Sequence, residues 1–204
     1  LERAWGTYRY NVFIFSGFIF INKKYKVVAA GVTTAVVLLV QLAVFFTPAP
    51  DIEIVMFSVG NADSIYISIG GEKHYLVDTG RYYDTSLVVI PYLSSKGINK
   101  LDGIFITHSD IDHSQGLYDI TEEIECSHIY VSEYSMPENN EGKYTFEPLG
   151  AGDTLDLGRD AVITVLCPSG LVPQSDNDAS IVFLLEQGDF SMLFTGDAGD
   201  SADP

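Results

Sequence analysis

The sequence predicts a mixed α/β domain that is preceded by a transmembrane helix. Two observations indicate this fold class: a charge-free run of twenty residues near the N-terminus and, after residue 50, short apolar segments that alternate with turns and enclose one amphipathic helix. The chain has 204 residues and begins with Leu. We therefore expect it to be part of a longer polypeptide, with one domain and its membrane attachment.

The charge-free run occupies residues 27–46 (VVAAGVTTAVVLLVQLAVFF). At about 1.5 Å per residue, a helix of this length spans roughly 30 Å of hydrocarbon. Its only polar residues are Thr33, Thr34 and Gln41, which favours a transmembrane helix over a buried helix of a soluble core. A signal peptide is disfavoured because the run is too long and another apolar run, residues 10–21, precedes it.

Charge divides the chain into two parts. Residues 1–50 contain one acidic and five basic residues, a net of +4, whereas residues 51–204 contain the other 27 acidic and 6 basic residues, a net of −21. Lysines at positions 23, 24 and 26 precede the helix, so the positive-inside tendency predicts a cytoplasmic N-terminal side and an extracellular domain. The predicted parts are a juxtamembrane or partial membrane segment, the transmembrane helix, a linker and the domain, at residues 1–26, 27–46, 47–50 and 51–204.

The domain begins with strands that alternate apolar and polar residues and are separated by turns. The pair Gly70-Gly71 predicts a hairpin between the second and third strands. Residues 86–96 predict an amphipathic helix despite Pro91, with Gly97 as its C-terminal stop. Because a strand precedes this helix and another follows it, we expect a parallel crossover. The predicted strands occupy residues 51–59, 64–69, 74–77, 103–107, 129–133, 161–166, 180–186 and 190–195.

Two imidazoles and two carboxylates lie within six residues directly after the apolar strand at residues 103–107, in the sequence His108-Ser-Asp-Ile-Asp-His113. Burial of these groups costs free energy unless a divalent cation compensates them. If the loop is extended, His108 and Asp110 face one ion while Asp112 and His113 face a second. Nitrogen and oxygen ligands suit Zn²⁺, Mn²⁺ or Fe, and the carboxylates favour the harder Mn²⁺.

A further carboxylate, Asp197, follows the last predicted strand in Phe194-Thr-Gly-Asp197. In this position it could bridge two ions about 3.5–4 Å apart, a geometry that suits displacement at phosphorus. The alternatives are a simple Gly-Asp turn and, for residues 108–113, a solvated loop that caps the following helix with Asp112 or Ser114. Two histidines at a strand end favour the metal site.

His108-Ser-Asp-Ile-Asp-His113 resembles the H-x-[HD]-x-D-H signature of the metallo-β-lactamase fold, in the H-x-D-x-D-H form of ComEC-type DNA-uptake channels. Other segments resemble the same family in the same order, and together they cover about residues 51–197. These segments are Val59-Gly-Asn-Ala-Asp-Ser64, Leu76-Val-Asp-Thr-Gly80, Ile90-Pro-Tyr-Leu93 with Gly97-Ile98 and Leu101-Asp102, Asn177-Asp-Ala-Ser-Ile-Val-Phe183 and Leu193-Phe-Thr-Gly-Asp197.

The resemblance implies an αββα sandwich with two divalent metal ions, Mn²⁺ or Zn²⁺, at the edge of its two sheets. The family usually supplies a histidine as third ligand of the first ion, whereas the matching segment here offers Asp176, Asn177 and Asp178, among which the sequence does not choose. Carried over by position, His108 and Asp110 bind one ion, Asp112 and His113 bind the other, and Asp197 bridges them. Asp112, His113 and Asp197 are the catalytic candidates, and Asp78 and Asp63 orient the ligands by hydrogen bonding.

The resemblance further implies degradation of single-stranded DNA outside the cell, beside the other parts of a membrane DNA-uptake channel. A net charge of −21 opposes binding of a polyanion. A surface hydrolase of a small phosphodiester, ester or lactone therefore remains an alternative, and so does a catalytically silent, channel-associated domain. The family's domain continues beyond its T-G-D segment, so we expect residues 51–204 to be incomplete at the C-terminus.

The two cysteines, Cys126 and Cys167, are 41 residues apart and form no C-x-x-C pattern. An extracellular domain could join them in a disulfide, or both could be buried thiols. The sequence leaves both possibilities open.

Overall fold

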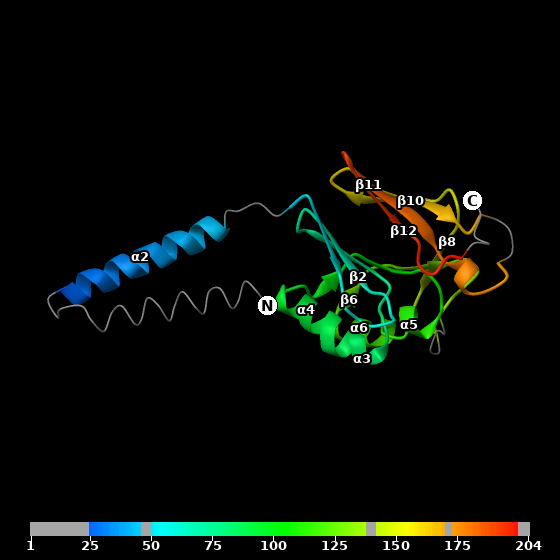
Figure 1. Ribbon diagram of the computed structural model, residues 1–204, viewed down its shortest axis with the longest axis horizontal. Helices are drawn as coiled ribbons and strands as arrows, with labels where there is room; N and C mark the ends of the chain where they lie inside the picture. The colour runs from blue at the N-terminus through cyan, green and yellow to red at the C-terminus, as the bar shows by residue number, and fades with distance from the viewer. Residues whose placement is uncertain (1–24, 46–49, 138–141, 170–172, 200–204) are drawn as a thin grey trace. The chain divides into compact units, whose positions relative to one another are not determined.

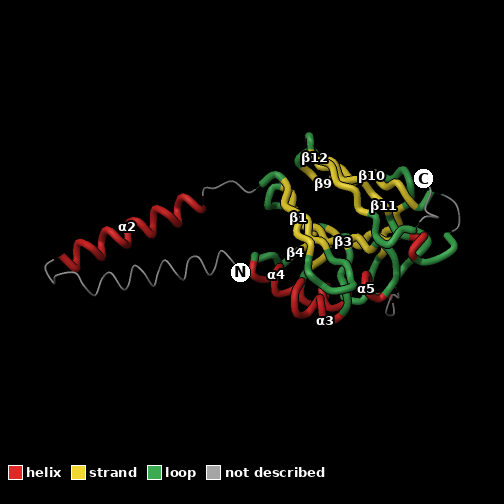
Figure 2. The backbone as a smooth tube through the Cα atoms, viewed as in Figure 1, coloured by secondary structure: helices red, strands yellow, loops and turns green. Residues whose placement is uncertain are grey.

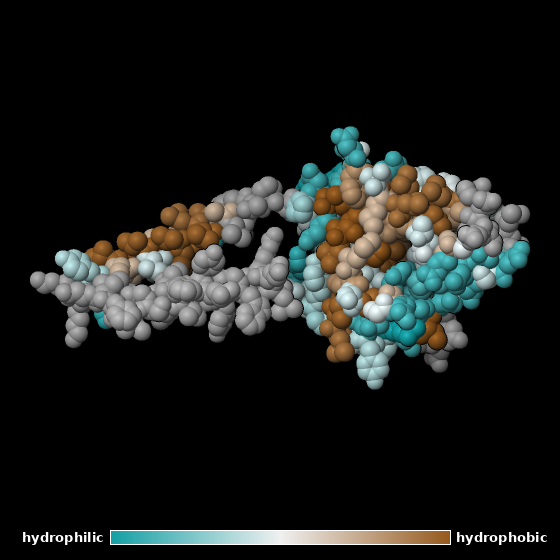
Figure 3. Space-filling model, viewed as in Figure 1, coloured by the Kyte–Doolittle hydropathy of each residue, from teal (hydrophilic) through white to brown (hydrophobic). Residues whose placement is uncertain are grey.

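The computed structural model describes residues 25–45, 50–137, 142–169 and 173–199, and the chain divides into two compact units, residues 1–48 and 49–204 (Figure 1). In the first unit, the helix α2 (Lys26–Phe45) nearly coincides with the predicted transmembrane helix. Residues 26–43 of α2 are long and apolar enough to cross a membrane, and hydrophobic residues lie along it (Figure 3). The predicted juxtamembrane segment before residue 25 and linker residues 47–49 lie outside the described residues.

The second unit contains a six-stranded mixed sheet. The first three strands are antiparallel, with a loop at residues 57–64 between the first two and a short turn between the next two, and the remaining strands add in parallel. The parallel pairing of the third strand with the strand after the helix confirms the predicted crossover. In spatial order the strands are β1 (Ile52–Met56), β2 (Ile65–Ile69), β3 (Lys73–Val77), β5 (Gly103–Ile106), β7 (Ile129–Ser132) and β8 (Phe146–Leu149).

A second, antiparallel sheet lies against one face of the first (Figure 2). Its spatial order is β12 (Phe190–Phe194), β11 (Val182–Gln187), β10 (Ala161–Cys167) and β9 (Thr154–Gly158). Two short parallel strands, β4 (Lys100–Leu101) and β6 (Glu125–Cys126), form a separate pair. The strands β8 and β9 were not predicted; both lie at sheet edges, and β8 contains Pro148.

Helices cover the other face of the six-stranded sheet (Figures 1 and 2). The described residues therefore form three of the four layers of the predicted αββα sandwich. The helices on this face are α3 (Tyr82–Asp84), the π-helix η2 (Thr85–Val89), α4 (Ile90–Ser95), α5 (Ile111–Ser114) and α6 (Leu117–Glu123), and a 3₁₀-helix, η4 (Asn177–Ala179), precedes β11.

The predicted helix at residues 86–96 is longer than expected and irregular. It begins at Tyr82, and its middle part forms π-type hydrogen bonds, in which the Ile90 amide donates to the Thr85 carbonyl. Pro91 has no amide hydrogen, so the usual α-helical bond at that position is lost in any case, and the wider turn lies directly before it.

The loop after β5 is not extended throughout, which corrects the prediction for residues 108–113. Residues 111–114 form the helical turn α5, in which the amides of His113 and Ser114 donate to the Asp110 carbonyl. Asp110, not Asp112 or Ser114, occupies the N-cap position, and its side chain makes no capping hydrogen bond. The alternative of a simple capping loop therefore loses its support.

The six-stranded sheet is buried on both faces, and alternate residues of its strands enter two hydrophobic clusters. Leu76 of β3 and Ile104 of β5 face the helices, whereas Val77 and Phe105 face the second sheet. Phe105 stacks against Tyr130, with ring centroids 4.8 Å apart. Burial of such side chains supplies the main driving force for this fold, at roughly 25 cal/mol per Å² of apolar surface.

Cys126 and Cys167 are not joined by a disulfide in this fold. Cys167 is buried and Cys126 is partly buried, and burial raises the pKa of the Cys126 thiol to about 11. The structure thus contains the thiol alternative and no Cys126–Cys167 disulfide.

We expect Gly116→Ala to destabilise the domain, because a Cβ at this position would clash with the Thr85 hydroxyl and lie 2.8 Å from the Thr79 carbonyl oxygen. Overpacking of this kind costs about 1–3 kcal/mol of unfolding free energy. The measurement is thermal unfolding of the chain in detergent, followed by circular dichroism. Gly199→Ala is the control, since its Cβ would meet only Asp178 Oδ1 at 3.5 Å. Equal melting temperatures for the two variants would contradict this packing.

Candidate metal site

The predicted site residues follow the ends of three strands. Asp78 is the first residue after β3, His108 is the second after β5, and Asp197 is the third after β12. Since β3 and β5 are parallel neighbours, their carboxyl ends lie at the same edge of the six-stranded sheet. β12 belongs to the other sheet, so the site lies where the two sheets meet.

Gly196 allows β12 to approach this edge closely. It has a φ of +49°, and a Cβ at this position would lie 2.8 Å from the Thr107 Cβ and 3.2 Å from the Ser180 Cβ. A larger residue would push the chain away from Thr107. The glycine of the Thr-Gly-Asp sequence therefore sets the position of Asp197.

The structure brings together His108, His113 and Asp197, each of which offers a ligand atom within 4.8 Å of the other two. His113 Nε2 lies 3.5 Å from Asp197 Oδ1, and His108 Nε2 lies 3.5 Å from Asp110 Oδ2. Both imidazoles are buried, with ring centroids 4.1 Å apart, whereas the two carboxylates are partly exposed. The imidazole nitrogens of the cluster are therefore buried, and its carboxylates are the groups in contact with solvent.

Asp78 orients both imidazoles. Its carboxylate accepts hydrogen bonds from His113 Nδ1 at 2.9 Å and from the Thr107 hydroxyl and amide, each at 2.8 Å. The Thr107 hydroxyl donates its hydrogen to Asp78. The Thr107 hydroxyl oxygen can therefore accept a hydrogen bond from His108 Nδ1, which lies 3.1 Å away. These contacts at Nδ1 leave the Nε2 atoms of both histidines facing the site.

Burial and neighbouring charges have opposing effects on the pKa values of Asp78 and His113. Burial raises the pKa of Asp78, and the hydrogen bond and charge of His113 oppose that rise. Burial alone would lower the pKa of His113, but the hydrogen bond from its ring to Asp78 and the charges of Asp78, Asp197 and Asp63 raise it to about 9. At neutral pH, His113 without a bound cation therefore carries a proton on Nε2 as well, which a metal ion would have to displace.

One polar atom supports the fit of a cation. His108 Nε2 is buried and has no hydrogen-bond partner, which costs free energy unless another group binds its lone pair. The nearby ligand atoms are imidazole nitrogens and carboxylate oxygens, a set that suits Zn²⁺ or Mn²⁺. The residues of the site therefore fit a divalent metal ion.

The remaining predicted residues lie at varying distances from this cluster. Asp112 Oδ2 lies 3.5 Å from an Arg81 guanidinium nitrogen, and its side chain is partly exposed. The amide of Asp63 donates to the Asp112 carbonyl, which joins the β1–β2 loop to α5. Within the described residues, no hydrogen bond or ion pair joins Asp176 or Asp178 to the two histidines.

Hydroxyl groups near the site were missed by the sequence prediction. Thr107 and Ser180 both lie within 3.3 Å of His108 Nδ1. Ser135, which follows β7, contacts the loop after His108. Its hydroxyl accepts a hydrogen bond from the Ser109 amide at 2.8 Å and donates one to the Ser109 hydroxyl. Thr107 directly precedes His108, and Ser180 lies in the segment Asn177-Asp-Ala-Ser-Ile-Val-Phe183. Their positions in these two motifs were the signal in the sequence that could have indicated them.

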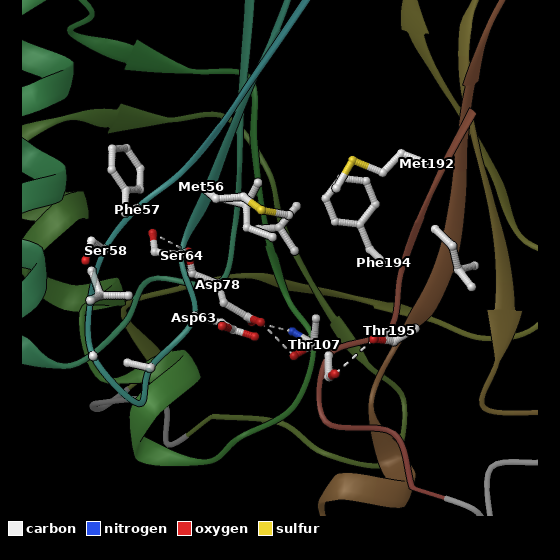
Figure 4. Close-up of a pocket in the computed structure, with 17 residues that line it drawn as sticks. Met56, Phe57, Ser58, Asp63, Ser64, Asp78, Thr107, Met192, Phe194 and Thr195 are labelled. Atoms are coloured by element: carbon white, nitrogen blue, oxygen red, sulfur yellow. Dashed lines mark hydrogen bonds between the residues drawn. The ribbon is translucent and has the colours of Figure 1, made fainter. Parts of the chain in front are cut away.

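A pocket of about 450 Å³ opens beside the cluster, between the edge strands β1 and β12 (Figure 4). Figure 4 shows Met56 and Phe57 on one side and Met192 and Phe194 on the other. Asp63, Asp78, Thr107 and Thr195 line its polar end. The pocket therefore joins apolar walls to the carboxylates near the metal site, and it could hold a substrate group next to the reacting centre.

Comparison with known proteins places these observations in a family. The profile of the Metallo-beta-lactamase superfamily matches residues 58–203. Among solved structures, metallo-β-lactamase SMB-1 bound to 2-mercaptoethanesulfonate has a TM-score of 0.54 at 16% identity, covering 71% of this chain and 60% of the other. The Rm3 metallo-β-lactamase has a TM-score of 0.52 at 14% identity, covering 72% and 62%. These likenesses concern the fold.

The curated relatives are competence and recombination proteins. ComE operon protein 3 of Bacillus subtilis (strain 168) is 27% identical over 170 residues, which cover 71% of this chain and 22% of the relative. Competence protein ComA of Neisseria gonorrhoeae is 27% identical over 151 residues, 74% of this chain and 20% of the relative. Recombination protein 2 of Haemophilus influenzae is 30% identical over 135 residues, 62% and 16%.

The chain thus spans about a fifth of the length of these relatives. The profile match covers most of the chain, and the two sheets, the histidine signature and the Thr-Gly-Asp segment all fall within it. The chain therefore belongs to the metallo-β-lactamase superfamily.

Proposed function

We propose that this chain is a metal-dependent phosphodiesterase that degrades single-stranded DNA as part of a membrane DNA-uptake system. The observation that carries the proposal is the cluster of His108, His113 and Asp197, together with the buried Nε2 of His108, which has no hydrogen-bond partner. Its similarity to competence proteins supports the DNA-uptake context.

In the proposed site, two divalent ions, Mn²⁺ or Zn²⁺, would be shared among residues at the edge where the two sheets meet. His108 and Asp110 would hold one ion, with Asp176 or Asp178 as a further ligand. Asp112 and His113 would hold the other ion, and Asp197 would bridge the two. The 3.5 Å separations of His108 from Asp110 and of His113 from Asp197 agree with this division.

Bound ions would supply a Lewis acid for the phosphodiester and lower the pKa of a bound water. The chain's own residues perform the remaining tasks. Asp78 keeps the Nε2 atoms of both histidines turned toward the site, and Asp63 lies at the polar end of the adjacent pocket. Met56, Phe57, Met192 and Phe194 line the apolar part of that pocket, where they would contact an apolar part of the substrate.

The membrane placement rests on α2 and the flanking charges. Three lysines precede the helix and the strongly acidic domain follows it, which supports a cytoplasmic N-terminal side and an extracellular hydrolase domain. In this orientation the domain would act on DNA at the cell surface, beside the membrane-embedded parts of an uptake channel.

A second candidate substrate class follows from charge. The net charge of −21 on residues 51–204 favours a small phosphodiester, ester or lactone over a polyanion. The same ligands would serve that chemistry. The two candidates differ in which substrate is cleaved and agree on which residues are required.

We expect the chain in detergent with Mn²⁺ to cleave single-stranded DNA, and Asp112→Ala to reduce the rate by at least about 100-fold because a ligand of the second ion is removed. The assay is gel electrophoresis of a labelled oligonucleotide. Asp189→Ala, an exposed carboxylate at the opposite end of β12, is the control and should cleave normally. Cleavage of a chromogenic phosphodiester but not of DNA would favour the second candidate, and absence of both metal binding and cleavage would favour a catalytically silent domain.

We expect Asp78→Asn to weaken Mn²⁺ or Zn²⁺ binding by roughly 10- to 100-fold, because an amide cannot accept all three hydrogen bonds that orient the two histidines. Titration calorimetry gives the dissociation constant. Asp102→Asn is a matched control, since Asp102 accepts hydrogen bonds from the His74 amide and Lys73 Nζ at the opposite ends of β3 and β5 from the cluster. An unchanged affinity in Asp78→Asn would refute this role.

Metal affinity should also rise with pH. The pKa of His113 is raised to about 9, so a proton competes with the cation for Nε2 below this pH. The apparent affinity should increase up to about tenfold per pH unit between roughly pH 6.5 and 9, and then level off. Mn²⁺ titrations across this range test the effect, and an affinity that is constant between about pH 7 and 9 would be inconsistent with it.

A further inference from the structure

We propose that Arg81, Tyr82 and Tyr83 form a docking platform for the bases and a phosphate of single-stranded nucleic acid, next to the metal site. This inference rests on the proposed function and names the substrate contacts that it requires. The platform is formed by the first residues of the helical segment that follows β3.

Direct contacts connect the platform to the site. A guanidinium nitrogen of Arg81 lies 3.5 Å from Asp112 Oδ2, and Asp112 immediately precedes His113. The Tyr82 amide donates to the Gln115 side-chain oxygen at 3.2 Å, and Gln115 is the C-cap residue of α5. The platform is therefore fixed to the same helical turn that carries the proposed ligands.

The two tyrosines are exposed side chains that serve no core. Tyr82 is 50% and Tyr83 is 74% exposed, and their rings contact each other edge to face, with centroids 5.5 Å apart and planes at 78°. Tyr66 and Tyr75, by contrast, are buried and contact rings inside the fold. Large apolar groups left in water favour the binding of a partner that covers them.

Neighbouring apolar residues extend this surface. Leu87, one helical turn after Tyr83, is 73% exposed, and Ile111 at the start of α5 is 63% exposed. The surface therefore combines aromatic and aliphatic groups around one arginine. Such a combination suits a ligand with flat aromatic groups and a negative charge, as in a strand whose bases are unpaired.

Base stacking also explains how an acidic domain could bind a negatively charged strand. The domain is strongly acidic, and Asp84 and Asp112 lie near Arg81, so many phosphate contacts cannot provide the affinity. Bases stack on aromatic rings through their π-faces, a contribution that does not need a positive surface. Arg81 then supplies one phosphate contact close to the ions. In a duplex the bases are already stacked and paired, so the platform favours single strands.

Binding can be measured without catalysis. The chain in detergent with EDTA is titrated into a fluorescein-labelled oligothymidylate of roughly ten nucleotides, and fluorescence anisotropy gives the affinity. Tyr82→Leu and Tyr83→Leu should each weaken binding by roughly 5- to 100-fold, whereas Tyr82→Phe and Tyr83→Phe, which keep the ring, should bind nearly as well as the unchanged chain. An abasic strand and a duplex of equal length should bind more weakly.

Arg81→Gln should weaken binding and reduce the slope of log affinity against log salt concentration by about 0.7, the value for one phosphate contact on a single strand. Arg159 and Phe190 provide matched controls. Arg159 is an arginine of similar exposure that pairs with Glu72 at 2.9 Å, and Phe190 is an exposed aromatic residue that lines a different pocket with it. Arg159→Gln and Phe190→Leu should leave the affinity unchanged.

The platform is overturned if the Leu variants bind the oligothymidylate as tightly as the unchanged chain, or if the abasic strand or the duplex binds equally well. If the Leu variants also keep the KM for DNA while Asp112→Ala abolishes cleavage, the platform fails and the proposed function stands. If the unchanged chain binds the strand through the tyrosines but cleaves nothing with Mn²⁺, the platform stands and the proposed function fails.

Discussion

The site depends on the burial of one carboxylate, that of Asp78. Removing a charged carboxylate from water costs several kcal/mol, and three hydrogen bonds from Thr107 and His113 offset this cost. The same bonds determine which nitrogen of each histidine faces the site. Asp78 also has a φ of +54°, a left-handed conformation that Asp tolerates better than most residues, so the turn after β3 directs the carboxylate inward. Substitution at this position would disturb the turn, the burial and both imidazoles together.

Much of the fold could be predicted from local patterns. Strands such as β2, β3 and β5 have apolar residues at the expected period, and their order around one helix implied the parallel pairing that the structure contains. The elements that were missed are short or lie at edges, where pairing partners distant in the sequence determine the conformation. The helical turn α5 was missed because four residues are too few to show a helical period in the sequence. The turn is held by hydrogen bonds to the Asp110 carbonyl.

For the site, the sequence predicted residue types better than their contacts. Residues 108–113 and Asp197 are 84 positions apart at the nearest, yet ligand atoms of His108, His113 and Asp197 lie close together where the two sheets meet. The contact of Asp112 with Arg81 and the hydroxyls of Thr107 and Ser180 were not anticipated. Spacing along a chain gives the order of residues, whereas the direction of a hydroxyl hydrogen or a guanidinium group follows from packing by neighbours on other elements.

The close approach of Gly196 to Thr107 makes the site a joint between the two sheets, since β12 belongs to one sheet and β5 to the other. Cations shared by Asp197 with His108 and with His113 would thus crosslink the two sheets of the sandwich. Cation binding and the packing of the sheets would then be thermodynamically linked. A change that weakens the packing between the two sheets would lower the affinity for the ion, and ion binding would stabilise that packing.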